Sequence, residues 1–367
     1  MKLSLSNISH KIEVLEKKEE EFSFFDIASH LEQIQANATT FAEILSPFSY
    51  EDFSTIYQKI LDLPISLQPL ISSTLHVSSM TSIAGILKNK NLHVLYGENT
   101  YFECVKAVKW ASRATSTLEA TEEQFSSADL ILAQFNPSWS GINGVKDKYR
   151  VEDIPLFLHK AFKNRQKPLI LALDCTIDYI FSENIKNLFE EFKYKILEGR
   201  LCIICYRSGT KFDLFGMDNY CGAPFYIIND NSNTWNFLRS LTEDPALKTD
   251  LLSLQWFCLT YLYAAEEIDL YRKYLFENTK SLLQKIPSSL FNGKMYQIIP
   301  FDEKGNPVFL DIIVKSPFHA LKIKALVGGN LGIKCLESNL PVFHRMSLGM
   351  CHTNLSILTS VKYSTLR

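Results

Sequence analysis

Short apolar runs alternate with helix-like segments through the middle of the chain, and this alternation limits the possible folds more than any other feature. The runs are ADLILAQF (128–135), PLILALD (168–174) and LCIICY (201–206), and segments such as IPLFLHKAF and NIKNLFEEFKYKI lie between them. Strands that alternate with helices favour a mostly parallel sheet covered by helices on both faces. Ligands bind such sheets outside the carboxyl ends of the strands. We therefore expect an α/β fold with its functional residues at the ends of these runs.

The pattern of the chain changes twice, which predicts three units. Residues 1–65 are acidic and have a helical pattern, and residues 66–250 carry the runs of a large cofactor-binding domain. A smaller α+β domain is expected over 251–367, with one long helix to about residue 285 and then the strands NPVFLDIIV, LGIKCLE and HRMSLGM. The apolar start of that helix is too short to span a bilayer and contains Gln255, which indicates a buried helix.

Charge and cysteine content exclude several classes of function. The chain has 38 Lys and Arg against 40 Asp and Glu, so nothing in its net charge of −2 favours binding to nucleic acid or to an anionic membrane. The eight cysteines follow no disulfide spacing, and the pair Cys202 and Cys205 lies inside an apolar run, which indicates buried reduced thiols. The N-terminus lacks the apolar region of a signal peptide, and the histidines lack metal-binding spacing. We expect a cytoplasmic protein without a metal site.

Polar residues follow three of the apolar runs. Asn136 follows ILAQF, Asp174 ends LILALD, and Ser208 to Lys211 follow CIICYR. An aspartate beneath a ring nitrogen, a lysine that forms a Schiff base and hydroxyls that hold a phosphate are the groups a pyridoxal phosphate (PLP) enzyme requires. An anionic Asp174 would keep the ring nitrogen protonated, and a desolvated Lys211 would be a neutral amine.

Six short motifs between about residues 70 and 360 resemble those of the fold-type I PLP-dependent enzymes, most closely the Cys/Met-metabolism (trans-sulfuration) family. SSMTSI resembles the phosphate turn, and HVLYGENTYFEC the strand and turn that end in the tyrosine stacked on the cofactor. FNPS resembles the Asn-Pro segment, LALDCT the segment that pairs with the ring nitrogen, and SGTKFDLFGMD the lysine segment. HRMSLGM resembles the segment whose arginine holds the substrate carboxylate. The resemblance implies a homodimer or a dimer of dimers that binds PLP and an amino acid.

The resemblance also implies roles for individual residues. The catalytic residues would be Lys211, Asp174 and Tyr101, and the substrate would be held by Arg345 and Asn136. The residues expected to bind the cofactor are Ser79, Met80, Tyr101, Asn136, Asp174, Thr176, Ser208, Thr210 and Lys211. The backbone N–H groups of Ser79 and Met80 would open a helix, where the helix dipole favours an anion.

Elimination or replacement at the β or γ carbon of an amino acid, as in cystathionine synthases and lyases, is the reaction that the resemblance implies first. Aminotransfer is the alternative, and a binding or regulatory protein that keeps the fold without catalysis is the third interpretation. That interpretation rests on departures from the family pattern around the phosphate. Ser79 replaces a glycine, Phe102-Glu103-Cys104 replaces Gly-Gly-Thr, and the first arginine of the chain is Arg113. Strand alternation directs Arg207 away from the site.

Overall fold

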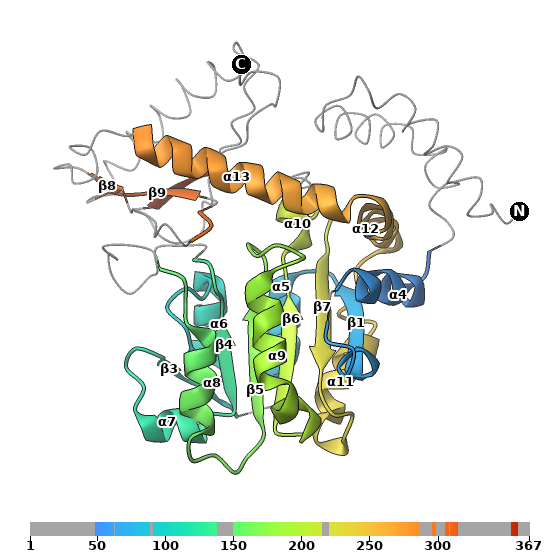
Figure 1. The fold of residues 1–367 in the computed structure, drawn as a ribbon, viewed down its shortest axis with the longest axis vertical. Helices are drawn as coiled ribbons and strands as arrows, with labels where there is room; N and C mark the ends of the chain where they lie inside the picture. The colour runs from blue at the N-terminus through green and yellow to red at the C-terminus, as the bar shows by residue number, and fades with distance from the viewer. Residues whose placement is uncertain are drawn as a thin grey trace, which may run out of the picture.

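A seven-stranded sheet lies at the centre of the molecule (Figure 1). The computed structural model describes residues 48–61, 63–88, 91–137, 150–214, 220–285, 296–298, 305–307, 309–314 and 354–358. The strand order is β1-β7-β6-β5-β4-β2-β3. The strands are β1 (Ile71–His76), β2 (His93–Tyr96), β3 (Arg113–Ser116), β4 (Leu130–Ala133), β5 (Leu169–Asp174), β6 (Leu201–Tyr206) and β7 (Ala223–Ile228). The five strands from β6 to β3 are parallel, and β7 runs antiparallel to both β6 and β1.

Helices connect the strands, and several of them begin at residues whose side chains cap the N-terminus. They are α4 (Tyr50–Ile60), α5 (Ser79–Leu87), α6 (Phe102–Ala111), α7 (Glu122–Ser127), α8 (Ile154–Phe162), α9 (Glu183–Leu197), α10 (Gly209–Phe212), α11 (Asn236–Glu243), α12 (Leu251–Tyr263) and α13 (Ala265–Lys285). Ser49 with Asp52, and Thr121 with Gln124, form capping boxes that satisfy backbone N–H groups at the starts of α4 and α7. Asp250 caps α12 in the same sense, since its carboxylate accepts from the N–H of Ser253.

Neighbouring residues along each strand face opposite sides of the sheet, so each strand contributes to two hydrophobic cores. Leu171 packs into a core formed with α4, α7, α8, α9, α12 and α13. Ile170 and Ala172 pack into a second core formed with α5, α6 and α11. Full burial of a large aliphatic side chain stabilises the fold by about 1.5–3 kcal/mol. Because both faces are covered, each parallel strand reads as a continuous apolar run in the sequence.

The predicted α/β fold and its three apolar strands are confirmed. β4, β5 and β6 fall within 128–135, 168–174 and 201–206. The segment ISSTLH forms the strand β1, which the sequence analysis did not identify. Its antiparallel pairing with β7 explains the difference, because Ser73 and Thr74 are buried there despite their polarity. β3 and β7 were not anticipated.

The expected single helix over 251–285 is instead two helices. Residue Ala264 leaves the helical conformation, with φ −137° and ψ 26°, and Glu266 and Glu267 then favour a new helix N-terminus. The start of this segment is a buried helix, as predicted, and Gln255 hydrogen-bonds both backbone polar groups of Phe48. α13 lies across the carboxyl end of the sheet (Figure 1). Within the described ranges, no helix combines the length and the apolar character needed to cross a bilayer.

Antiparallel strands β8 (Tyr296–Ile298), β9 (Phe309–Val314) and β10 (Asn354–Leu358) form a second sheet, in the order β10-β9-β8. β9 lies in the predicted strand NPVFLDIIV, whereas the predicted strands LGIKCLE and HRMSLGM lie outside the described residues. The helical stretch predicted before residue 48 lies outside them too. The domain boundaries at 65 and 250 stay a prediction. α12 contributes Leu254, Trp256 and Phe257 to the same core as the large sheet.

Candidate functional site

Lys211 lies in the four-residue helix α10, directly after the carboxyl end of β6. Two hydrogen bonds fix the start of this turn: the N–H of Ser208 donates to Thr176 Oγ1 at 2.9 Å, and that of Gly209 donates to Gly222 O at 2.9 Å. Position 209 requires glycine because a Cβ there would collide with the ring of Phe257. The turn is therefore set against both α12 and the loop that follows β5.

The Lys211 amine lies over an aromatic face. Its Nζ is 5.0 Å from the centre of the Tyr101 ring, and Tyr101 occupies the N-cap position of α6, after the carboxyl end of β2. A cation at this distance from a tyrosine face is attracted by the ring quadrupole. Two residues predicted from distant motifs thus meet at the edge of the sheet, as a site at the strand ends requires.

Asp174 ends β5 opposite Tyr206 of β6 and is 6% exposed. Its Oδ1 accepts from the N–H of Thr176 at 2.9 Å. Burial raises the pKa of Asp174, while hydrogen bonds from Thr176 and the positive charges of Lys211 and Arg207 oppose that rise. Thr176 also accepts from the N–H of Ser208, so hydrogen bonds join the loop after Asp174 to the turn that carries Lys211.

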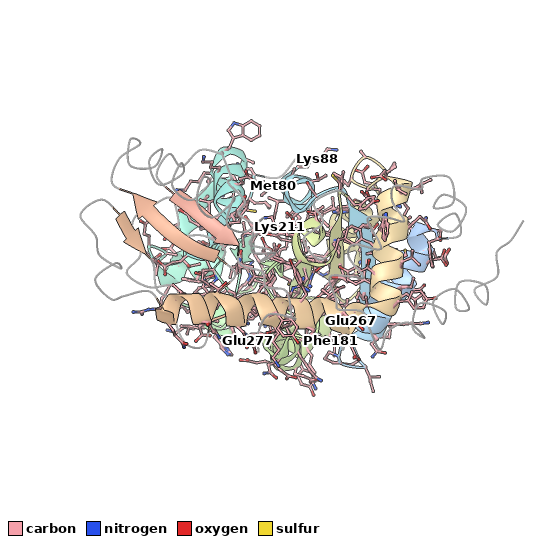
Figure 2. The ribbon with its side chains drawn as sticks, turned by 90° about the horizontal axis from the view of Figure 1, so that it is seen from above. Met80, Lys88, Phe181, Lys211, Glu267 and Glu277 are labelled. Carbon is pink, nitrogen blue, oxygen red and sulfur yellow. The ribbon has the colours of Figure 1, made fainter. Side chains whose placement is uncertain are left out.

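The N-terminus of α5 reaches the same region. Ser79 and Met80 are its first two residues, as predicted, and Ser78 caps the helix by accepting from the N–H of Thr81 at 3.1 Å. Figure 2 looks down on this end of the sheet, with Met80 and Lys211 on one side of α13. The sulfur of Met80 is 3.7 Å from that of Cys104, whose thiol in turn feels the charges of Asp174 and Lys211. Burial raises the pKa of that thiol far above its usual range.

Asn136 lies at the carboxyl end of β4 and is held on both sides. Its Nδ2 donates to Asp178 Oδ1 at 2.8 Å, and its Oδ1 accepts from the N–H of Asn306 at 3.0 Å. Burial raises the pKa of Asp178 to about 6, opposed by the hydrogen bond from Asn136 and the charge of Arg207. The sequence analysis missed Asp178. The only signal was a second aspartate four residues after Asp174.

Hydroxyl groups line the lysine turn. Ser208 Oγ and Thr210 Oγ1 form a hydrogen bond of 3.3 Å, in which either hydroxyl can donate, and their contact with a phosphate stays a prediction. Thr176 has a different place from the one expected, since its Oγ1 accepts from the N–H of Ser208 and so joins the ends of β5 and β6. A direct contact of Thr176 with a cofactor stays a prediction.

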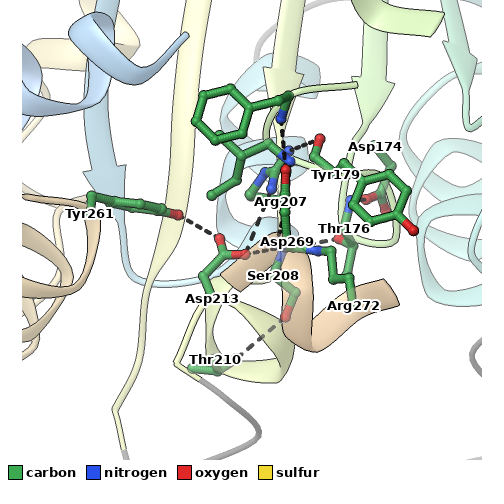
Figure 3. A network of polar contacts seen from close by, with 12 residues as sticks. Asp174, Thr176, Tyr179, Arg207, Ser208, Thr210, Asp213, Tyr261, Asp269 and Arg272 are labelled. Atoms are coloured by element: carbon green, nitrogen blue, oxygen red, sulfur yellow. Dashed lines mark hydrogen bonds and ion pairs between the residues drawn. The ribbon is translucent and has the colours of Figure 1, made fainter. Parts of the chain in front are cut away.

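The arginines near the lysine turn are paired with buried carboxylates (Figure 3). Arg207 Nη1 is 3.6 Å from Asp213, and Arg272 hydrogen-bonds the same carboxylate. Arg207 therefore points to Asp213, in agreement with strand alternation. The sequence analysis missed the roles of Asp213 and Arg272, although Asp213 stands in the motif SGTKFDLFGMD. Arg345 lies outside the described residues, so its contact with substrate stays a prediction.

The donor set fits PLP. A buried carboxylate for the ring nitrogen, an amine for the aldehyde, an aromatic face, paired hydroxyls and a helix N-terminus all face one end of the sheet. One further atom, Asp178 Oδ2, is buried without a hydrogen-bond partner among the residues that the structure describes. Buried polar atoms of this kind are uncommon in folded proteins, and a bound group or an ordered water would satisfy it.

No family model and no curated protein matches the chain. Solved structures do match, at TM-scores of 0.53. L-threonine-O-3-phosphate decarboxylase from Porphyromonas gingivalis is 13% identical, over 90% of this chain and 92% of that one. Histidinol-phosphate aminotransferase from Clostridium acetobutylicum is 13% identical, over 90% of each chain. Cystathionine gamma synthase from Xanthomonas oryzae pv. oryzae is 11% identical, over 86% of this chain and 82% of that one. The protein has the fold of the fold-type I PLP-dependent transferases.

Proposed function

We propose that this protein is a PLP-dependent enzyme that acts on an amino acid. One observation carries the proposal: the Lys211 amine lies over the Tyr101 ring, on a turn that is hydrogen-bonded through Thr176 to the loop after the buried Asp174. The three solved structures described above are named for a decarboxylase, an aminotransferase and a synthase. Because these three names cover different reactions, they support the class of enzyme and do not indicate one reaction.

Each residue has a task that its position allows. PLP, when bound, withdraws electrons from the carbon next to the substrate nitrogen. Asp174 would hold a proton on the ring nitrogen, and Tyr101 would pack on the ring face. Lys211 would bind the aldehyde carbon and then move a proton at its Nζ.

The phosphate would be held largely by neutral donors. Ser208 and Thr210 supply hydroxyls, and the first turn of α5 supplies the N–H groups of Ser79 and Met80. Arg207 and Arg272 already pair with Asp213, so neither of these arginines would bind the phosphate. This arrangement supports PLP binding that is weaker than an arginine anchor would give.

For the reaction we propose elimination or replacement at the β or γ carbon, which rests on the motifs that resemble the trans-sulfuration family. Arg345 would hold the substrate carboxylate. We further propose a homodimer in the cytoplasm. The six cysteines within the described residues are free and five of them are buried, which fits a reducing compartment.

An absorbance spectrum of protein loaded with PLP tests the proposal first. Borohydride reduction and peptide mass mapping should then place a pyridoxyl group on Lys211. A label on a different lysine, or on none in cofactor-saturated protein, contradicts the proposal.

A screen of amino acids separates the reactions. Ammonia with a ketoacid, or a released thiol, indicates elimination, whereas transfer of the amino group to an added ketoacid indicates aminotransfer. Light scattering gives the oligomeric state.

A further inference from the structure

A network of four charged side chains, three of them buried, joins helix α10 to helix α13 (Figure 3). We call it the Asp213 network, and its members are Arg207, Asp213, Asp269 and Arg272. Asp213 is fully buried and accepts hydrogen bonds from the Tyr261 hydroxyl, at 2.5 Å, and from Arg272 Nη2. Arg207 Nη1 lies 3.6 Å from the same carboxylate. One carboxylate therefore joins β6, α10, α12 and α13.

The other end of the network holds the loop that follows Asp174. Arg272 Nη1 is 3.4 Å from Asp269 Oδ1. The two oxygens of Asp269 accept from the N–H groups of Ile180 and Phe181 at 2.7 and 2.9 Å. The loop after β5 and the turn after β6 are thus fixed to the same helix, α13.

The charges of the network balance, with two guanidinium groups and two carboxylates. Burial acts to lower the pKa of Arg207, but the combined electrostatic effects of neighbouring groups, Asp213 foremost, outweigh burial, and the pKa is raised well above the usual value. Burying charges is costly, and an apolar set of the same volume is often at least as stable. Stability therefore does not explain the network, whereas a need for fixed geometry does.

Helix α10 needs such an anchor because it has only four residues, too few for a helix to persist by itself. Asp213 is its C-cap residue, and the Asp213 N–H donates to Gly209 O at 3.0 Å. We infer that Asp213 and Arg272 are positioning residues, which hold Lys211 in register with Asp174 through α13. The inference rests on the proposed function, because Lys211 and Asp174 are its two principal residues.

Three variants and a matched control test the inference. Arg272→Met and Asp213→Asn break the network, and Tyr261→Phe removes one hydroxyl from it without changing charge, in case the first two fail to fold. Arg165→Met is the control. Arg165 is also buried, and it donates to the backbone carbonyls of residues 126, 167 and 168, at the opposite end of β5 from Asp174.

Full-length variants are incubated with PLP, reduced with borohydride and mapped by mass spectrometry. The readout is labelling of Lys211 relative to the exposed Lys163. Misplacement of reacting groups costs rate steeply, so Arg272→Met and Asp213→Asn should lower this ratio on the order of tenfold or more. Tyr261→Phe should lower it less. Arg165→Met should leave it near the wild-type value even where it lowers the melting temperature equally. An unchanged ratio in the network variants, or an equal fall in Arg165→Met, overturns the inference.

A second readout needs no cofactor and separates the two proposals. Competitive acetylation by acetic anhydride gives the reactivity of Lys211 relative to Lys163. If PLP does not label Lys211 in the wild type, the proposed function fails, and the acetylation ratio alone decides the inference. The ratio should then change several-fold in the network variants and stay constant in Arg165→Met. Equal ratios in all proteins overturn the inference.

Discussion

Two buried polar clusters in this protein differ in whether all of their polar atoms are partnered and uncharged. His76, at the end of β1, is fully buried with both ring nitrogens partnered: Nδ1 is 2.8 Å from Ser82 Oγ, and Nε2 is 2.9 Å from Leu241 O. Its ring stacks on Phe225. The cluster at the ends of β5 and β6 instead holds charged groups and, in Asp178 Oδ2, a buried atom without a partner in the described structure. A closed neutral cluster indicates a structural role, whereas an open charged one indicates a functional site.

Burial shifts the pKa values of His76 and Asp178 toward their uncharged forms, but the two groups differ in charge at pH 7. It lowers the pKa of His76 to about 4, so the histidine is uncharged and carries no penalty. It raises the pKa of Asp178 to about 6, so that carboxyl is still ionised at pH 7 and the fold carries the cost of a buried charge. The following predictions test this difference.

Removing the amine of Lys211 should have the largest effect. Lys211→Ala should abolish covalent attachment of PLP and lower turnover at least about 10³-fold, because an alanine can neither attach the cofactor nor transfer a proton. Stability should change little, since Lys211 is only partly buried. Pyridoxyl mapping and turnover measurements check this, with exposed Lys163→Ala as the control. Normal turnover in Lys211→Ala would remove this lysine from the chemistry.

Replacing the buried carboxylate at the end of β5 should come next. Asp174→Asn keeps the shape and the oxygen that accepts from Thr176, but a neutral amide does not hold a proton on the ring nitrogen. Loss of one electrostatic stabiliser costs about 10²–10³ in turnover. The affinity for PLP should fall far less, because the phosphate contacts remain. Titration of PLP binding alongside turnover separates the two effects, and a parallel loss of both would assign Asp174 a purely binding role.

The sequence predicted the parts of this fold that local pattern controls. β5 and β6 were recognisable because both of their faces are buried, so LILALD and LCIICY contain no polar interruption. β1 was not, because ISSTLH is polar and its strand conformation comes from pairing with β7, about 150 residues later. A local window of sequence cannot contain that information.

The candidate site likewise contains residues that the local sequence predicted and residues that it did not. Lys211 and Asp174 stand at strand ends, where parallel topology brings side chains together. Arg272, which hydrogen-bonds Asp213 from α13, is 59 residues away from it, and no spacing rule leads from one to the other. The sequence analysis also missed the break at Ala264, which separates α13 from α12. Alanine favours continuation of a helix, so the local sequence does not indicate the break.

The His76 cluster should make stability fall in mild acid. The unfolded chain binds the histidine proton near pH 6.5, whereas the folded protein binds it only near pH 4. Unfolding therefore takes up a proton between these values, and stability is lost as pH falls from 6.5 to about 4, by roughly 3 kcal/mol at about 1.36 kcal/mol per pH unit. Urea unfolding at several pH values checks this. His76→Gln should flatten the curve, and the exposed His159→Gln should not. Parallel curves for wild type and His76→Gln would contradict a buried neutral histidine.

The substitution Asp178→Asn should raise the stability of the protein at neutral pH, by less than the loss in acid that we expect from His76. The folded protein holds the Asp178 proton below about pH 6 and the unfolded chain only below 3.8, so wild-type stability from this group rises as pH falls between the two values. Above pH 6 the ionised carboxylate costs roughly 3 kcal/mol, and an amide removes that cost. The new amide donors lack an acceptor in place of the unpartnered Oδ2, so the net gain at pH 7.5 should be about 1–2 kcal/mol.

The gain should disappear near pH 4, where the wild-type carboxyl is itself neutral. Glu198→Gln is the matched control, because Glu198 is exposed in a surface pair with Lys195 and its charge carries no burial cost. Turnover of Asp178→Asn should fall while stability rises, because the acceptor that holds Asn136 is weakened at the end of β4. A loss of stability at pH 7.5, or a gain that persists at pH 4, would place Asp178 with His76 as a closed structural group.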